Sequence, residues 1–465
     1  AFAFVLTLCR GRSHDEYYFA NPEKITGDPP PVPFITMGQS RIIKRLLAKE
    51  CLRRAFWNAG VRWWNSPVPP DSHGEFGLAV DPNNQCGWAQ NENAVVSWLN
   101  SQKSEQAEII KALTNRDDAI LLDWISNELT TFISDSVNNP ELSGDGLAER
   151  LAEGAILPMY GMPSRTRNLY HYAKGQIVKV IDRDLEMSIT EFAPGAQKTK
   201  DKAIHTSIGF TPPLVNHGYR WIPATNNPLP YRRWMQRCKI CNNIDTSDLP
   251  LTDKSCIYCG QPEDEDHNFY QFQIAVPQAY RTDFSPGEDA KEDTDILAGA
   301  PSLLAESNTA MIESKQVGNC NLSASDNGRV WRINDNAGRL FEGSIITYDG
   351  MEHQWISSKH GGSPGESIAL AAGKTTEVLR LQPADIPFGL NIDPLHSYGA
   401  VKGAIYSAAF LLRRVLASEL DIDPDEIEIA NFTRKGDTGE LAYADIVMSD
   451  RLPNGAGFVK CEQVP

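Results

Sequence analysis

The chain has 465 residues, with 44 Lys and Arg against 60 Asp and Glu, so its formal net charge is −16. Its 41% hydrophobic and 22% charged content excludes a mainly disordered chain, and no run reaches the roughly 18 to 20 apolar residues of a membrane-spanning helix. At roughly 100 to 200 residues per domain, the length predicts several domains. The negative sum by itself argues against nucleic acid as a partner, because phosphates attract a positive field.

The first 160 residues are predicted to be mainly helical after one short strand. Residues 1–8 form an apolar run with aromatic side chains, which predicts a buried strand of an α/β sheet. The proline-rich residues 28–33 predict an extended linker, because each proline fixes φ and lacks an N–H donor. Apolar periodicity then predicts a helix over 40–54. Similar periodicity predicts further helices near 92–103, 105–115, 118–137 and 144–155.

The predicted helix at 40–54 carries a cationic stripe on the side opposite its apolar residues. The six cations of this stripe are Arg41, Lys44, Arg45, Lys49, Arg53 and Arg54. A solvated helix face is the usual explanation of such a stripe, and contact with nucleic acid or a partner protein is the alternative.

The rest of the chain is predicted to be mainly β-structure. Residues 328–382 alternate like hairpins, with 329–334 joined to 340–348 by a turn. The remaining predicted elements are strands at 176–181, 203–210, 427–433 and 441–448 and a helix at 401–419. The last two strands are joined by a glycine-containing hairpin turn at 435–439.

Four of the nine cysteines form two CxxC pairs that stand fourteen residues apart, Cys238-Lys-Ile-Cys241 and Cys256-Ile-Tyr-Cys259. Each pair can place two thiolates on a tight turn, and the spacing lets the pairs meet tetrahedrally around Zn²⁺. A closed four-thiolate set predicts a structural ion, because no coordination position stays open for catalysis. A redox dithiol or an iron–sulfur cluster is the alternative. The other five cysteines are scattered singly, which favours a reducing compartment, so we expect a cytoplasmic protein.

The charge is unevenly distributed along the chain. Residues 158–238 carry twelve Lys and Arg against five Asp and Glu, whereas residues 239–301 carry four against thirteen. Basic residues interleaved with aromatic rings suit a single nucleic-acid strand, because cations follow the phosphates and rings stack on bases. The alternative is a solvated lysine-rich turn with the rings in the core. The candidate DNA-binding residues are Arg165, Arg167, Lys198, Lys200, Lys202, Arg232 and Arg233.

The sequence offers little for catalysis. Gly373-Lys374-Thr375 ends like a phosphate-binding loop, but Ile368 stands where that loop needs its first glycine. The run 361–365 formally matches G-x-S-x-G, but Pro364 lacks the N–H that an oxyanion hole requires. Glycine-rich turns are the simpler interpretation of both. The acidic run 421–428 is predicted to be a helix-to-strand turn with exposed carboxylates, and we expect no catalytic residues in this chain.

Several short motifs, in this order along the chain, resemble those of large superfamily 2 DNA helicases. The opening AFVLTLCRGRSHDEYYFANPEKITGDPPPVPF resembles the stretch that follows their last ATPase motif, where the second RecA-like domain ends. LPMYGMPSR at 157–165 and EFAPGA at 191–196 are similar to their LP-x-YG-F/M-P and E-F/Y-APG elements. From about residue 400, the predicted helix, the strand 427–430 and DRLPNGAGF at 450–458 resemble the domain of unknown function 1998 (DUF1998), the zinc-binding domain of mitomycin-repair-type helicases. DISARM-type phage-defence helicases of the DrmA/DrmB group share this organisation.

The resemblance implies the C-terminal accessory part of an ATP-dependent DNA helicase or translocase in phage defence or DNA repair. ATP and Mg²⁺ would bind only in an N-terminal half, because the nucleotide-binding motifs of such enzymes would lie upstream of Ala1. The implied partners are DNA, in single-stranded form, and a subunit of a defence complex, with no membrane. Family members usually carry further cysteines after the Gly-Ala-Gly turn, where this chain has only Cys461, so it stays open whether Cys238–Cys259 is the family zinc site. The alternative function is a zinc-stabilised protein-interaction scaffold that does not bind DNA.

The predicted elements and the resemblance together imply an α+β multidomain protein. Its expected segments are the end of a second RecA-like α/β domain at 1–27, a helical accessory domain at 28–160, a basic β-rich segment at 161–235, a four-cysteine zinc module at 236–262, a β-rich region at 263–390 and a truncated DUF1998-like α/β domain at 391–465.

Overall fold

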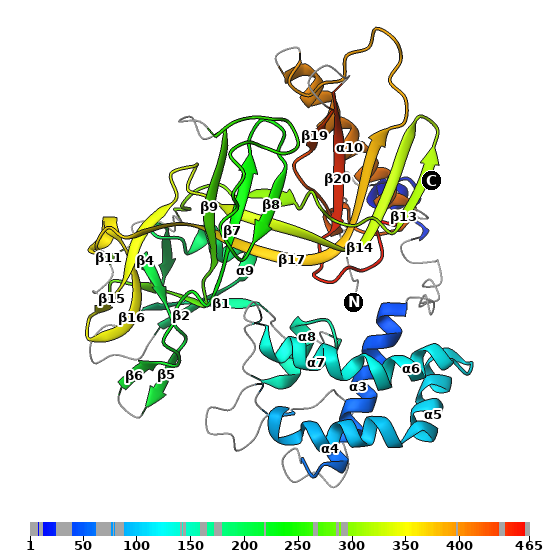
Figure 1. Cartoon of the computed structure of the whole chain (residues 1–465), viewed down its shortest axis with the longest axis vertical. Coiled ribbons are helices and arrows are strands. Elements are labelled where there is room, and N and C mark those ends of the chain that lie inside the picture. The colour runs from blue at the N-terminus through cyan, green and yellow to red at the C-terminus, as the bar shows by residue number, and fades with distance from the viewer. Residues whose placement is uncertain are drawn as a thin grey trace, which may run out of the picture.

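The structure is a computed structural model in which helices and strands occupy separate regions. It describes residues 8, 13–24, 40–61, 76–77, 79, 88–139, 142, 146–158, 165–171, 179–217, 220–263, 268–284, 288–289, 296–396, 399–436 and 442–460. The helices of the N-terminal third lie together below a large sheet, and the rest of the chain builds that sheet (Figure 1). The protein is therefore of mixed α+β class, as the sequence predicts.

Six helices form one unit, which we call the helical unit. They are α3 (Ser40–Asn58), α4 (Trp88–Ser101), α5 (Lys103–Thr114), α6 (Ala119–Asn127), α7 (Leu129–Asn138) and α8 (Leu147–Glu153). The unit has its own apolar core, to which α3 contributes the buried side chains of Leu47, Cys51 and Leu52 at helical spacing. Asp118 caps α6 by accepting hydrogen bonds from two backbone N–H groups of its first turn. A short helix, α1 (Ser13–Ala20), precedes the unit.

The predicted helices are confirmed with one change. The helix predicted at 40–54 is α3, and those predicted near 92–103, 105–115 and 144–155 are α4, α5 and α8. The helix predicted at 118–137 is instead two helices, α6 and α7, which meet at Glu128, where φ is −112° and the right-handed helical backbone is distorted. This break lets both helices bury their apolar sides in the same core. The strand predicted at 1–8, apart from its last residue, and the linker predicted at 28–33 lie outside the described residues.

Eighteen strands of the described chain join into one mixed sheet. Its longest members, β14 (Cys320–Asn334) and β17 (Glu366–Pro383), run antiparallel from the pair Cys320↔Pro383 to the pair Asn334↔Leu370. The pairs β1–β10 and β9–β17 are parallel. The other strands of this sheet are β1 (Thr166–His171), β2 (Lys179–Asp184), β3 (Gln197–Lys200), β4 (Ala203–Thr211), β7 (Tyr231–Cys238), β8 (Ile244–Ser247), β9 (Phe269–Val276), β10 (Ala279–Thr282), β11 (Glu288–Asp289), β12 (Ser302–Ala305), β13 (Glu313–Val317), β15 (Phe341–Tyr348), β16 (Met351–Ser357), β18 (Ile427–Ile429), β19 (Thr433–Lys435) and β20 (Tyr443–Asp450). A separate hairpin is made by β5 (Leu214–His217) and β6 (Arg220–Pro223).

The middle of the sheet is covered by a short helix, α9 (Leu185–Glu191), which begins after the capping residue Asp184. Beneath α9 lies a second apolar core, which includes the fully buried rings of Phe210, Trp331 and Trp355. Alternation of apolar and polar residues along these strands places the large rings on one face.

The C-terminal part confirms the predicted helix at 401–419 and the antiparallel pairing of the strands after it, whereas most of the turn predicted at 435–439 lies outside the described residues. Helix α10 (Ala400–Glu419) packs on β18 and β20 through a third apolar core. A 3₁₀ turn at Pro424–Glu426 leads from this helix into β18, as predicted for the acidic run. The strand predicted at 427–433 is interrupted after Ile429, so that β18 and β19 pair separately with β20.

The hairpin predicted between 329–334 and 340–348 is wrong. The strands β14 and β15 do not pair with each other, because both pair with β17: Asn334 lies opposite Leu370 and Phe341 opposite Ile368. Residues 335–340 therefore form an excursion, after which the chain returns to the same partner strand. Asp335 holds the excursion in place by accepting hydrogen bonds from Arg237 (3.0 Å) and from the Tyr270 hydroxyl (3.1 Å).

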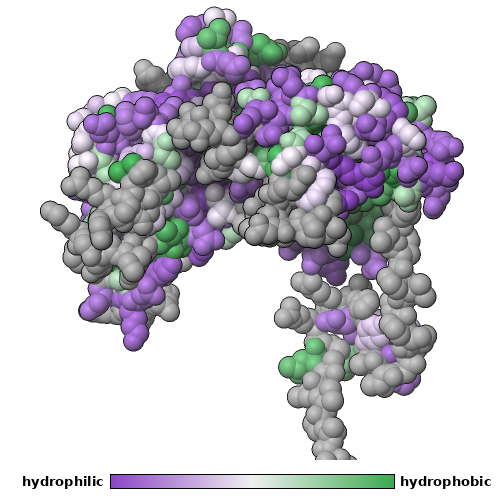
Figure 2. All heavy atoms as spheres, turned by 90° about the horizontal axis from the view of Figure 1, so that it is seen from below, coloured by the Kyte–Doolittle hydropathy of each residue, from purple (hydrophilic) through white to green (hydrophobic). Residues whose placement is uncertain are grey.

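The surface seen from below is mainly hydrophilic, and its exposed hydrophobic atoms lie in small separate spots where described residues are in view (Figure 2). No helix within the described ranges combines the length and the apolar character that a membrane crossing requires.

Candidate metal centre and basic cleft

The four cysteines of the two CxxC pairs come together in space. Cys238 ends β7 and Cys241 follows in the next turn, while Cys256 and Cys259 lie in a second turn. Their four Sγ atoms all lie within 4.8 Å of one another. The shortest separations cross between the pairs, at 3.6 Å for Cys238–Cys259 and 3.5 Å for Cys241–Cys256.

These distances test whether the cluster fits a metal ion. Four thiolates at about 2.3 Å from Zn²⁺ in a tetrahedron would have sulfur–sulfur edges of about 3.8 Å. The observed separations are close to that value, whereas a disulfide requires about 2.0 Å. The four side chains therefore fit a tetrahedral Cys₄ ion site.

The protonation of the cluster also suits a metal. Hydrogen bonds from the thiols of Cys238 and Cys256 lower the pKa of Cys241 far below that of a free thiol. The same sharing with Cys241 raises the pKa of Cys238. Three of the four side chains are buried and Cys259 is half-buried. Since metal ligands must be thiolates, a cluster that already favours one thiolate is suited to cation binding.

The cysteine cluster is tied to the C-terminal strands. The backbone N–H of Arg434 in β19 donates to the carbonyl of Cys241 (2.8 Å), and Asn243 Nδ2 donates back to the Arg434 carbonyl (3.3 Å). The guanidinium of Arg434 binds the carboxylate of Asp393 with two hydrogen bonds of 2.8 Å. The cluster thus connects chain segments that are about 190 residues apart in sequence, which is a bracing role.

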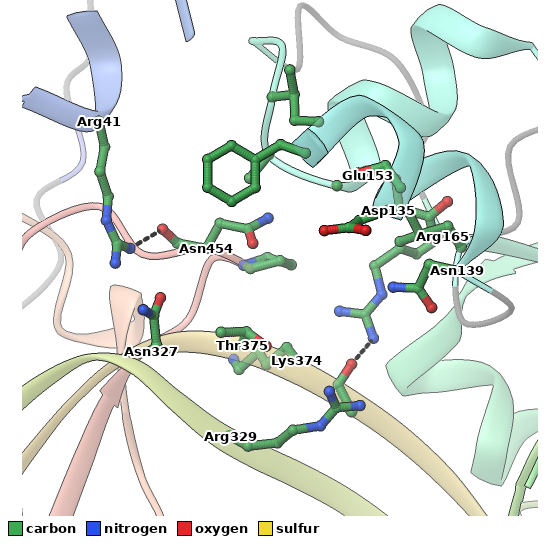
Figure 3. Close-up of a pocket in the computed structure, with 18 of the residues that line it drawn as sticks. Arg41, Asp135, Asn139, Glu153, Arg165, Asn327, Arg329, Lys374, Thr375 and Asn454 are labelled. Atoms are coloured by element: carbon green, nitrogen blue, oxygen red, sulfur yellow. Dashed lines mark hydrogen bonds between the residues drawn. The ribbon is translucent and has the colours of Figure 1, made fainter. Parts of the chain in front are cut away.

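A second candidate site is a cleft of about 510 Å³ between the helical unit and the sheet, which we call the basic cleft (Figure 3). Helices α3, α6 and α7 and the segment after α8 form one wall, and β14, β17 and the turn at 453–454 form the other. Two acidic residues, Asp135 and Glu153, line it. Six cations line it: Arg41, Lys44, Arg45, Arg165, Arg329 and Lys374.

The six cations differ in whether they already interact with carboxylate or carbonyl groups of the protein. Lys374 is buried and pairs with Glu428, and Arg165 donates to the carbonyl of Gly373 (2.6 Å). In contrast, no carboxylate of the described chain lies within 4 Å of Lys44 or Arg45. Lys44 lies 5.1 Å from the ring of Trp124, and Arg45 donates one long hydrogen bond of 3.3 Å to the carbonyl of Asn454. The unneutralised charge of the cleft is therefore concentrated on α3.

The arginine beside Lys44 shows the effect of this crowding. Burial and the neighbouring charge of Arg41 lower the pKa of Arg45 from its usual value, although the group remains a cation. An anion in the cleft would offset this unfavourable field. Of the aromatic side chains that line the cleft, Phe132 is 44% exposed, whereas Trp124 and Trp331 are buried. Phe132 is thus the cleft ring that a planar ligand can reach.

The turn at 450–458 forms part of the same wall. Asp450 Oδ2 accepts three backbone hydrogen bonds, from Ala456 (2.6 Å), Gly457 (2.8 Å) and Phe458 (3.2 Å). The turn is therefore wrapped around one buried carboxylate, and this places Asn454 at the edge of the cleft.

The predicted DNA-binding residues are not brought together. Arg165 lines the basic cleft, and Lys202 is exposed in the turn between β3 and β4. Arg167 is 2% exposed and donates to the carbonyl of Pro277 (2.8 Å), while Lys198 is buried in an ion pair with Glu191. The other three are half-buried on internal partners: Lys200 on the Val180 carbonyl, Arg232 on Glu366 and Arg233 on Asp248. A DNA contact by these seven residues stays a prediction.

The cleft residues on α3 were visible in the sequence only as a cationic stripe. Arg329 was not singled out, because one arginine in an alternating strand carries no signal of its own. Lys374 was considered as the end of a phosphate-binding loop, but Gly373-Lys374-Thr375 lies inside β17. These three residues are therefore neither a phosphate-binding loop nor a glycine-rich turn. The run 361–365 is a turn, with Gly361 at φ +95°, as expected.

Comparison with known proteins gives one distant structural likeness. No protein-family model matches the chain, and no curated protein matches it. The chain is similar in structure to the DUF1998 helicase MrfA, in a crystal structure bound to DNA, with a TM-score of 0.34 and 9% sequence identity. The match covers 84% of this chain and 38% of the chain of that helicase.

Proposed function

We propose that this chain is the C-terminal accessory part of an ATP-dependent superfamily 2 DNA helicase or translocase, acting in phage defence or DNA repair. In this role the basic cleft holds one DNA strand while ATP binding and hydrolysis take place in the motor domains of the same machine. The observation that carries the proposal is the pair of cations on α3, Lys44 and Arg45, which face the cleft without a carboxylate partner among the described residues.

The dimensions and chemistry of the cleft favour a single strand. A cleft of about 510 Å³ is the size of a small-molecule site, so it accommodates a few nucleotides at most and no duplex. Cations that follow phosphates and a reachable ring such as Phe132 are the two features used by proteins that bind single strands without sequence preference. The ordered sequence motifs supply the link to helicases, and the cleft supplies the place of contact.

In the proposed machine Zn²⁺ has a structural part. Cys238, Cys241, Cys256 and Cys259 would hold the ion, which supplies a cross-link between two turns that share little apolar core. Through Arg434 this cross-link also braces β19. We propose the segment boundaries on the same basis: a helical accessory domain at 28–160, β-rich segments at 161–235 and 263–390 on either side of a zinc module at 236–262, and a DUF1998-like domain from 391, with 1–27 closing a RecA-like domain.

Binding of a fluorescent single-stranded oligonucleotide tests the proposal. The wild-type chain is expected to bind with an affinity that falls steeply as salt rises, because bound phosphates displace counterions. The double variant Lys44→Ala with Arg45→Ala should bind at least tenfold more weakly and with a smaller salt slope. No binding at low salt by the folded wild-type chain would contradict the proposal.

The matched control removes two cations elsewhere on the surface. Lys315 on β13 and Arg414 on α10 are both exposed and do not line the cleft. The double variant Lys315→Ala with Arg414→Ala changes the net charge equally. If it weakened binding as much as the α3 variant, the effect would come from overall charge and the cleft would not be the site.

A protein-interaction scaffold is the second candidate function, and one observation favours it. Helix α10 exposes Phe410 (52%), Leu411 (65%) and Val415 (40%) on its outer side, away from its packed core. Exposed apolar side chains of this size are typical of contact surfaces. Under this alternative, Leu411→Asp would abolish capture of a partner protein while DNA affinity stays negligible in every variant.

A further inference from the structure

The strand β17 carries a buried glutamate, Glu377, beside the turn at 450–458. Its side chain is 2% exposed, and the Asp450 carboxyl within hydrogen-bonding reach of it is fully buried. Two facing carboxyl groups in a buried site cannot both be ionised without strong repulsion. The pair therefore requires a compensating group.

The hydrogen bonds of the pair show which group is missing. Asp450 Oδ2 is satisfied by three backbone donors. Asp450 Oδ1 and Glu377 Oε2 are buried and have no donor among the described residues. One proton placed between these two oxygens satisfies both of them.

Charged groups from several neighbouring segments surround Glu377. Arg41 of α3 lies 3.8 Å from Glu377 Oε1, and Lys460 lies 3.9 Å from the same atom. Arg45 interacts with Glu377 at longer range, and Asp326 is paired with Arg41 at 3.9 Å. The cations favour ionised Glu377, but burial and the adjacent Asp450 outweigh them and raise the pKa of Glu377 to about 7.

The pair lies where three chain segments meet. Arg41 donates to the carbonyl of Asn454 (2.5 Å) and to that of Asp326 (2.6 Å). Asn454 belongs to the turn that wraps Asp450, and Gly455 of that turn packs against Glu377 so closely that an added Cβ would lie 2.9 Å from its side chain. Repulsion between two carboxylates would therefore push the turn away from β17 and disturb its contact with α3.

We propose that Glu377 and Asp450 share one proton, and that this proton fastens the turn at 450–458, and with it one wall of the basic cleft, to β17. Loss of the proton loosens the turn and its link to Arg41. The proposal concerns the turn itself and does not require that the cleft binds DNA. The DNA-binding proposal and the shared-proton proposal can therefore fail independently of each other.

The sign of the pH dependence follows from the raised pKa. The folded protein binds this proton more tightly than the unfolded chain, whose glutamate titrates near 4.5. The contribution to stability is complete below about 4.5 and is lost as the pH rises through about 7. Between these two values, one proton of linkage opens the turn up to tenfold more readily per pH unit, and above about 7 the dependence levels off.

Hydrogen exchange of the amides at 456–458 between pH 5 and 8.5, corrected for intrinsic rates, tests the proposal. In the wild-type chain protection should fall by up to tenfold per unit from about pH 5 to about 7 and change little above that. In Glu377→Gln the amide N–H replaces the shared proton, so protection should not change with pH. The exposed Glu313→Gln on β13 serves as the control and should behave like the wild type.

A second measurement keeps the test decisive if the glutamine variant is poorly folded. The carboxyl pKa of Glu377, measured by NMR in the wild-type chain, should lie well above that of an exposed glutamate and should fall in Asp450→Asn. A normal pKa for Glu377, or the same pH-dependent exchange in Glu377→Gln as in the wild type, would overturn the proposal.

Discussion

Arg41 and Asn454 are 413 positions apart in the sequence, and their side-chain Nη1 and backbone carbonyl are joined by a hydrogen bond of 2.5 Å (Figure 3). Arg41 stands near the start of α3, and Asn454 lies in the turn wrapped around Asp450. The contact joins the N-terminal helical unit to the C-terminal strands. The basic cleft therefore owes its shape to residues from both ends of the described chain.

Replacement of Arg41 should separate these two parts. Arg41→Ala removes two charge-assisted hydrogen bonds to carbonyl groups, so we expect the free energy of unfolding to fall by about 1.5 to 3 kcal/mol. Arg53→Ala is the control, because the partner of Arg53 among the described residues is the nearby Glu50 on the same helix, and such pairs contribute under about 1 kcal/mol. Urea unfolding of both variants measures the difference, and equal losses would contradict the linking role.

Gly455 should tolerate no side chain. Its φ is +72°, and an added Cβ would lie 2.9 Å from Glu377. We expect Gly455→Ala to cost about 1 to 3 kcal/mol, from backbone strain and the clash together. Gly403 in α10 is the opposite case, because nothing lies within 4 Å of an added Cβ there, so Gly403→Ala should raise stability by about 0.5 to 1 kcal/mol. Thermal melting distinguishes the two signs.

The sequence was most informative where a pattern is local. The periodicity of α3 and α10 and the spacing of the four cysteines depend on residues close together in the chain, and all three are confirmed by the structure. The excursion at 335–340 was missed because an alternating pattern shows that residues are in strands, without showing which strand they pair with. The pairing of both β14 and β15 with β17, on either side of the excursion, is supported by the contact of Asp335 with Arg237, which lies in a distant segment of the chain.

The dependence on distant partners also explains why the cations of the basic segment at 158–238 do not form one surface. A count of charges identifies cations but gives no information on their partners. Arg167 and Lys198 lie in a segment with a charge of +7, yet both are buried on carbonyl or carboxylate groups. The cleft forms where α3 meets β14 and β17, which lie hundreds of residues further along the chain, so no local pattern could have predicted it.

The cysteine cluster should bind one zinc ion per chain. Cys241→Ser should abolish stoichiometric zinc in the purified protein and lower its melting temperature, because the two turns and the contact with Arg434 lose their cross-link. Cys320→Ser lies outside the cluster and should retain the metal. Elemental analysis measures the zinc content. Full zinc occupancy in Cys241→Ser would show that the cluster is not the site.

Variants of Arg167 and Lys202 should distinguish an effect on stability from an effect on DNA binding. Arg167 is buried and donates to two backbone carbonyls, so Arg167→Met should reduce the free energy of unfolding by about 2 to 4 kcal/mol. Lys202 is exposed, and Lys202→Ala should change stability by less than about 0.5 kcal/mol. Denaturant unfolding and oligonucleotide binding are measured on both. Weaker DNA binding by a fully stable Arg167→Met would contradict its structural assignment.

Glu186 should make the fold sensitive to acid. Burial opposes its ionisation, but Lys374, Arg165 and Arg332 outweigh burial and lower its pKa below the ordinary value of 4.5. The folded protein therefore binds this proton less tightly than the unfolded chain, and the stabilisation present above about 4.5 is lost as the pH falls below it. Glu186→Gln should lower stability at neutral pH and give a shallower loss between pH 5 and 3 than the wild type. Glu352 is 76% exposed, so Glu352→Gln should follow the wild-type curve. If Glu186→Gln kept the wild-type slope, the acid sensitivity would come from other carboxylates, and the cluster around Lys374 would not be ionised in the folded protein.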